Sequence, residues 1–239
     1  IVQDGVTLTY TYDDNGNITK VSDGTKQTEY VYDDIGQLVQ VNDQTDTTAE
    51  TSGTKWVFEY DLGGNITSKK AYKYTSGSLY SSISYTYGAS GWKDKLTAYN
   101  GNTVSYDTIG NPTSDGTWTY TWEHGRQLQS MTRASDGYGL TFEYNENGMR
   151  TKKTSSTGYT SEYTWHGTNL THMKRGTTNL HFYYDAQGRP AILRYGPSTY
   201  GYLYNLQGDV IAIVDNTGTK VVEYTYDAWG KQLSCTGSK

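Results

Sequence analysis

Six aspartates stand at equivalent places in the sequence, and their carboxylates are the first candidates for chemistry. Each directly follows a tyrosine and precedes a glycine by three positions; they are Asp13, Asp33, Asp61, Asp107, Asp185 and Asp227. Catalytic carboxylates must converge on one focus, together with groups of other kinds. A residue that recurs at equivalent places forms a row instead, so we interpret these aspartates as caps that accept backbone N–H groups in turns.

The remaining candidates for chemistry form no known constellation. The histidines lack the His-Glu-x-x-His spacing of zinc enzymes, and Cys235, the only cysteine, has no histidine at zinc-ligand spacing. Segment 13–17 superficially resembles a calcium loop, but its glycine is misplaced and the bidentate glutamate is missing. We therefore predict no enzyme, with no catalytic residue, no metal site and no cofactor. A calcium site is the minor alternative.

The tryptophans raise a binding hypothesis. Exposed aromatic side chains stack on the faces of sugars, and the candidates for glycan stacking are Trp56, Trp92 and Trp118. The alternative is cross-strand packing, which Trp122 and Trp165 favour because they replace tyrosine at equivalent places in the sequence. We favour packing, and keep a carbohydrate or a cell-surface protein as the alternative partner.

These residues belong to a repeat that reads aromatic-x-aromatic-Asp-x-x-Gly-polar-aliphatic. Eleven copies, about 20 residues apart, align on the second aromatic, which we call the anchor. The tyrosine, aspartate and glycine are all kept in six copies, whose anchors are Tyr12, Tyr32, Tyr60, Tyr106, Tyr184 and Tyr226. The other anchors are Tyr87, Trp122, Tyr144, Trp165 and Tyr204. Eight copies keep the glycine: Gly16, Gly36, Gly64, Gly110, Gly148, Gly188, Gly208 and Gly230.

Each copy predicts one β-hairpin. Aromatics two positions apart share one face of a strand, the aspartate ends that strand, and the glycine takes the left-handed conformation of a hairpin turn. We predict positive φ at the eight glycines, and an exposed loop over 42–54. Eleven hairpins give about 22 strands, a sheet roughly 100 Å wide, which must curl because open sheets rarely exceed about 10 strands. The fold class is therefore all-β, a curled or spiral strip of antiparallel hairpins.

Composition supports a folded sheet and excludes two classes of partner. The 25 Tyr and 6 Trp supply apolar ring area that replaces an aliphatic core. A net charge of -5 provides no basic stripe for a phosphate backbone, so we expect no nucleic-acid partner. No apolar run approaches the ~20 residues that span a bilayer, so we expect no membrane span.

The repeat resembles the RHS/YD-repeat family, which includes bacterial polymorphic toxins, the C component of insecticidal Tc toxins and animal teneurins. The resemblance extends from Tyr10 to Lys231, and segments 202–210 and 221–230 look like the last repeats of an RHS core. It implies a hollow shell that holds or presents a C-terminal toxin domain, or a surface adhesion module. The Asp-Pro segment linked to self-cleavage in toxin members does not occur in this sequence, so self-cleavage is not carried over.

The organisation that follows is one array over 1–239, a fragment of a larger protein, with 232–239 as a frayed tail. The expected partners are neighbouring repeats and a C-terminal domain of the parent chain. We expect an extracellular or bacterial cell-surface location, because the chain is rich in Tyr, Thr, Gly, Asn and Ser and poor in cysteine.

Overall fold

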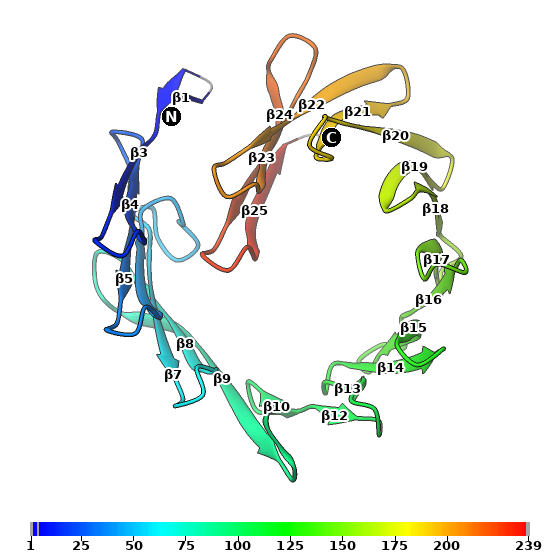
Figure 1. Ribbon diagram of the computed structural model, residues 1–239, viewed down its shortest axis with the longest axis horizontal. Helices are drawn as coiled ribbons and strands as arrows, with labels where there is room; N and C mark the ends of the chain where they lie inside the picture. The colour runs from blue at the N-terminus through cyan, green and yellow to red at the C-terminus, as the bar shows by residue number, and fades with distance from the viewer. Residues whose placement is uncertain (1, 4, 238–239) are drawn as a thin grey trace. The chain divides into compact units, whose positions relative to one another are not determined.

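The computed structural model describes residues 2–3 and 5–237 (Figure 1). About 61% of the chain is in strands, and the described part contains no helix, which confirms the predicted all-β class. The first strands are β1 (Val2–Gln3), β2 (Val6–Thr7), β3 (Thr9–Tyr12), β4 (Ile18–Ser22), β5 (Gln27–Tyr32), β6 (Leu38–Asp43), β7 (Thr54–Tyr60), β8 (Ile66–Lys73), β9 (Leu79–Ala89), β10 (Trp92–Tyr99), β11 (Asn102–Thr103) and β12 (Ser105–Tyr106).

The remaining strands continue the same alternation of strand and turn. They are β13 (Pro112–Ser114), β14 (Trp118–Glu123), β15 (Gln127–Arg133), β16 (Gly139–Tyr144), β17 (Arg150–Ser155), β18 (Thr160–His166), β19 (Asn169–Arg175), β20 (Thr178–Tyr184), β21 (Pro190–Tyr195), β22 (Ser198–Tyr204), β23 (Val210–Val214), β24 (Lys220–Tyr226) and β25 (Gln232–Gly237).

The strands pair in chain order, so each hairpin lies beside the next. β1 and β2 form a two-stranded sheet, β3 to β11 a nine-stranded sheet, and β12 to β25 a fourteen-stranded sheet (Figure 1). The sheets are not closed into a barrel. The predicted strip is therefore interrupted between β11 and β12, two strands of only two residues each, which offer little backbone for a continuous ladder.

Contacts divide the chain into two compact units. The first contains 1–101 together with 225–233, and the second contains 102–224 together with 234–239. The turn between β24 and β25 therefore packs with the first unit, although its strands belong to the fourteen-stranded sheet.

One face of each of the two larger sheets carries the anchor rings, and we call it the ring face. Val41, Phe58, Phe142, Tyr200 and Val222 lie on it and are buried, whereas the residues that alternate with the rings in β18 and β20 are exposed. This asymmetry follows from the period of two in the repeat, since successive side chains of a strand point to opposite faces.

A β-bulge recurs at the same place in nine hairpins. In the first, Thr11 pairs with Lys20 and Tyr12 pairs with Ile18, so Thr19 is an extra residue on the returning strand. The same shift precedes the anchor in the other eight hairpins. A bulge bends its strand and strengthens the local twist, and it moves every following residue to the other face.

Two segments differ from their sequence-based expectations. The predicted frayed tail forms β25 as far as Gly237, because the chain leaves the Gly230 turn as it leaves every other repeat turn; residues 238–239 lie outside the described residues. The predicted exposed loop over 42–54 folds back instead: Asp43 and Asp46 are buried. The Asp43 carboxylate accepts hydrogen bonds from the hydroxyls of Thr28 and Thr45, and such polar partners offset the cost of burying it.

Candidate functional site: the repeated turn

The six repeat aspartates cap their turns. In the second repeat, Oδ1 of Asp33 accepts the N–H groups of Ile35 (3.1 Å) and Gln37 (2.8 Å). The equivalent two bonds lie between 2.8 and 3.0 Å in the other five repeats. The glycine N–H donates to the carbonyl of the same aspartate, at 3.0 Å for Gly36 and Asp33. The capping hydrogen bonds that the sequence predicts are therefore present.

The glycines adopt the backbone conformation that the repeat predicts. All eight have positive φ, between 75° at Gly148 and 92° at Gly208. No atom outside the immediate chain neighbours lies within 4 Å of a Cβ added to Gly36, so this position requires glycine for its φ and not for space.

Asparagine replaces aspartate in two turns and makes the same cap. Oδ1 of Asn145 accepts the N–H groups of Asn147 and Met149, and Oδ1 of Asn205 accepts that of Asp209. Asp215 caps a further turn through Thr217 and Thr219, and sequence analysis missed it because no aromatic residue precedes it. An amide has no carboxyl proton to exchange, so these substitutions favour a geometric role.

Hydrogen bonds lower the pKa of three of the capping carboxyl groups, those of Asp13, Asp61 and Asp185. The side-chain amide of Asn17 holds the pKa of Asp13 below its usual range, and that of Asn65 does the same for Asp61. For Asp185, the bond from the Arg189 backbone is the largest cause of the lowered pKa. General acids and bases instead need a pKa near the working pH, so this environment suits a permanent acceptor.

The anchor side chains join one repeat to the next, a role that sequence analysis did not find. The Tyr32 hydroxyl donates to the carbonyl of Ile18 (3.0 Å), and the Tyr60 hydroxyl donates to that of Leu38 (2.6 Å). Each acceptor is the first residue of the returning strand in the preceding repeat. The bond recurs from Tyr87, Tyr144, Tyr184 and Tyr204.

Tryptophan makes the same bond where it replaces tyrosine. Nε1 of Trp122 donates to the carbonyl of Pro112, and Nε1 of Trp165 to that of Arg150, both at 2.7 Å. The ladder between β4 and β5 has its last pair at Lys20 and Glu29, two residues beyond Ile18. The anchor therefore continues the link between neighbouring repeats beyond the end of the backbone ladder. The signal in the sequence was that the anchor is always Tyr or Trp, two aromatic residues whose side chains can both donate a hydrogen bond.

The three tryptophans proposed for glycan stacking lie on separate strands. Nε1 of Trp56 donates to Asp46, and the Lys69 ammonium lies 4.3 Å from its ring. The Trp118 ring meets Tyr138 edge-on. Trp92 is 52% exposed. The structure brings no two of them into ring contact.

The turn between β24 and β25 is bound to β7 and β8 by what we call the clasp: Phe58, Lys69, Asp227 and Trp229. Lys69 Nζ lies 2.5 Å from Asp227 Oδ2, and their side chains are only 12% and 4% exposed. The Trp229 ring stacks on Phe58, with centroids 4.6 Å apart and planes 9° from parallel. Asp227 is thus both a turn cap and half of a buried ion pair, and sequence analysis found only the first role.

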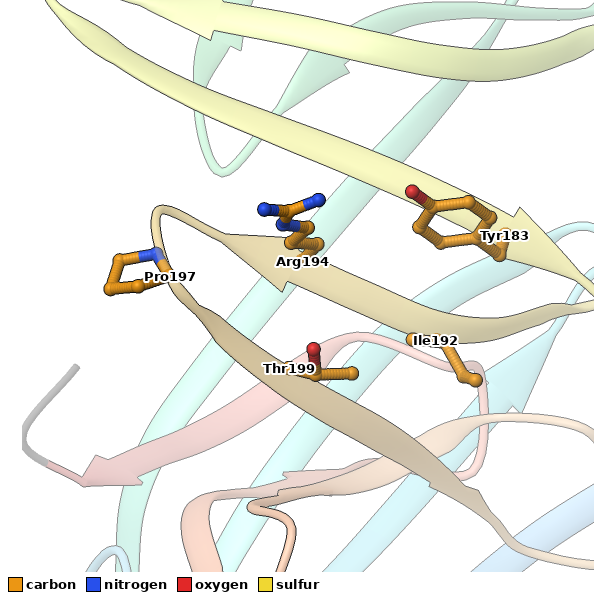
Figure 2. A pocket seen from close by; sticks show the side chains of 5 residues that line it. All are labelled: Tyr183, Ile192, Arg194, Pro197 and Thr199. Atoms are coloured by element: carbon orange, nitrogen blue, oxygen red, sulfur yellow. The ribbon is translucent and has the colours of Figure 1, made fainter.

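Other polar groups do not converge. His172 and His181, opposite each other on β19 and β20, stack with ring centroids 4.7 Å apart. The described residues hold no group of three or more potential metal-ligating side chains, and they include no helix that could cross a membrane. Figure 2 shows a depression on β20 to β22, lined by Tyr183, Ile192, Arg194, Pro197 and Thr199, which is open and has no carboxylate.

Comparison with known proteins places this repeat. The family model described as Teneurin YD-shell matches residues 22–238. The tRNA nuclease WapA of Bacillus subtilis strain 168 is 36% identical over 151 residues, 61% of this chain and 6% of that protein. The tRNA3(Ser)-specific nuclease WapA of Bacillus spizizenii is also 36% identical, over the same shares. This chain therefore spans about 6% of the length of these relatives.

Solved structures share the fold. TcdB2–TccC3 without its hypervariable C-terminal region matches with a TM-score of 0.67 at 14% identity, over 97% of this chain and 14% of that one. The Tc holotoxin pore of Photorhabdus luminescens matches with a TM-score of 0.68 at 15% identity, over 96% and 13%. With the family match over nearly its whole length, and with the repeated caps and anchors, this chain belongs to the teneurin YD-shell family of RHS/YD repeats.

Proposed function

We propose that this chain is a non-catalytic stretch of shell in a larger secreted protein, which encloses or presents a C-terminal toxin domain of the same polypeptide. The observation that carries the proposal is the recurrence of one turn. Every repeat aspartate accepts two backbone N–H groups, and successive repeats are joined through their anchors. Contacts that recur in this way suit a scaffold, whereas an active site needs groups of different kinds around one substrate atom.

The comparisons support this assignment. Relatives that share the repeats are named tRNA nucleases, and this chain matches only about 6% of their length. We assign the nuclease chemistry of such proteins to their other segments, and a scaffold role to repeats of the present kind. We further propose that 1–239 is one repeat array, located outside the cell or on the bacterial cell surface.

The absence of catalysis has a direct test. The purified chain is incubated with total tRNA, and separately alone, while gel analysis and intact mass report cleavage of RNA or of the chain. We expect both to stay intact. Cleavage that Asp33→Asn or Asp227→Asn abolishes, in variants that keep the wild-type circular dichroism spectrum, would overturn the scaffold proposal.

The enclosing role is tested in the parent protein. Limited proteolysis is followed by antibodies against the domain that comes after the repeats. Substituting Gly36 and Gly188 by alanine strains two turns and should speed degradation of that domain. Equal protection of the domain in the wild type, in the variant and in its isolated form would show that the repeats do not enclose it.

A further inference from the structure

At one position of the repeat the side chain differs in chemistry between hairpins, and the proposed scaffold role does not account for this difference. The third residue after the one that pairs with the anchor lies on the ring face, opposite the first aromatic of the same repeat. Six hairpins hold an apolar side chain there: Val21, Val41, Met131, Met173, Leu193 and Ile213. Two hairpins hold lysine instead. Lys69 pairs in register with Phe58, and Lys153 pairs in register with Phe142.

A lysine on this face needs an acidic partner, and Lys69 has one. Its ammonium bonds the Asp227 carboxylate in the clasp, where both side chains are largely buried. Asp227 reaches it from a turn distant in sequence, and it is the only buried aspartate of the six caps. The Phe58–Lys69 pair is thus a receptor for an acidic turn, occupied within the chain itself.

The Phe142–Lys153 pair has the same register, but no carboxylate in the described part of the chain bonds its lysine. Among the described residues, the ion pairs include neither Lys153 nor Arg150. The ring-face residues of β16, β17 and β18 contain no carboxylate, because Glu143 and Glu162 alternate onto the opposite face, where Glu143 bonds Lys152 at 3.1 Å.

Arg150 adds a second unsatisfied group beside this lysine. Its guanidinium lies 4.5 Å from the Phe142 ring centroid, on the same face as Lys153. Its Nε is buried and has no hydrogen-bond partner. Buried polar atoms are rarely left unpaired, since desolvation without a partner costs free energy. Ser161, opposite Lys153 on β18, is also buried and adds a hydroxyl.

From this arrangement we infer that Phe142, Arg150, Lys153 and Ser161 form a docking site for a carboxylate on a turn of another polypeptide segment. We call it the Lys153 site. The partner is an acidic turn of the kind that Asp227 presents to Lys69, supplied by a segment other than the described residues. The guanidinium already covers Phe142, where Trp229 covers Phe58 in the clasp, so recognition rests on the carboxylate and needs no aromatic side chain. A guanidinium and an ammonium together suit a carboxylate's two oxygens.

The inference goes beyond the scaffold role, because it assigns a specific site to one repeat. It is tested on the full chain by NMR of side-chain NH groups at Arg150 and Lys153. The probe is a synthetic peptide with the sequence of residues 224–231, compared with the same peptide carrying asparagine at the place of Asp227. We expect saturable shifts at both side chains, with at least tenfold weaker binding of the asparagine peptide.

Matched variants separate the site from general charge attraction. Lys153→Met places methionine where Met131 and Met173 stand in other repeats, so the fold should persist while peptide affinity falls at least tenfold. Lys152→Met removes the neighbouring charge on the opposite face and should leave affinity unchanged. The inference fails if neither side chain responds to millimolar peptide, if both peptides bind alike, or if the two lysine variants lose affinity equally.

Discussion

The clasp offers the sharpest test of how this chain holds its last hairpin. We predict that Lys69→Met destabilises the β24–β25 turn far more than a surface change would. The lysine and aspartate side chains are 12% and 4% exposed, so the substitution leaves a carboxylate buried without its counter-ion. Removing one partner of such a pair costs about 3–5 kcal/mol. The lower end applies here, because Oδ1 of Asp227 keeps the N–H groups of Trp229 and Lys231.

A double substitution isolates the ion pair. Lys69→Met with Asp227→Asn removes both charges, so its cost should be well below the sum of the two single changes, as coupled groups in contact require. Asp33→Asn is the matched control for the cap alone, because Asp33 makes the same two turn bonds and forms no ion pair in the described structure. It should change stability little, as the natural Asn145 and Asn205 caps indicate.

Two measurements check the prediction. Hydrogen exchange of residues 225–233 reports release of the turn, and urea unfolding followed by tryptophan fluorescence reports the free energy, since Trp229 stacks on Phe58. The reasoning is refuted if Lys69→Met leaves exchange in 225–233 at the wild-type rate, or if the single costs simply add in the double variant.

Three further outcomes are expected. Gly36→Ala should cost about 1 kcal/mol in urea unfolding because its φ is 80°, whereas Gly139→Ala, where φ is not positive, should cost less; equal costs would contradict the turn assignment. Burial raises the pKa of Tyr30 and Tyr202 to about 12, so the native state keeps protons that the unfolded chain loses near pH 10. Stability should therefore be maintained below pH 10 and fall as the pH rises toward 12, and tyrosinate absorbance appearing wholly near pH 10 in folded protein would argue against this. Trp92, the exposed member of the proposed glycan-stacking set, should show no saturable fluorescence quenching in a screen of sugars, and specific quenching lost in Trp92→Ala would instead favour carbohydrate binding.

Local features of the chain were sufficient to predict the hairpin. The aromatic pair, the aspartate and the glycine lie within seven residues, and each acts on its own backbone: alternation sets the face, the carboxylate caps the turn, and the glycine accepts positive φ. Asp33 and Gly36 therefore behave in the structure as their spacing predicts. The same logic explains why asparagine serves at 145 and 205, since the cap needs an acceptor and not a charge.

Contacts between distant segments were decided only by the tertiary structure. No spacing rule connects Lys69 with Asp227, because their meeting depends on where the β24–β25 turn packs. The sheet face on which Lys69 and Lys153 lie could not be predicted from the sequence, for a different reason. Counted by simple alternation from the start of its strand, Lys153 would lie opposite to Arg150, on the other face of the sheet. The bulge between Tyr144–Arg150 and Glu143–Lys152 inserts one residue and reverses that parity, so the two cations share the ring face.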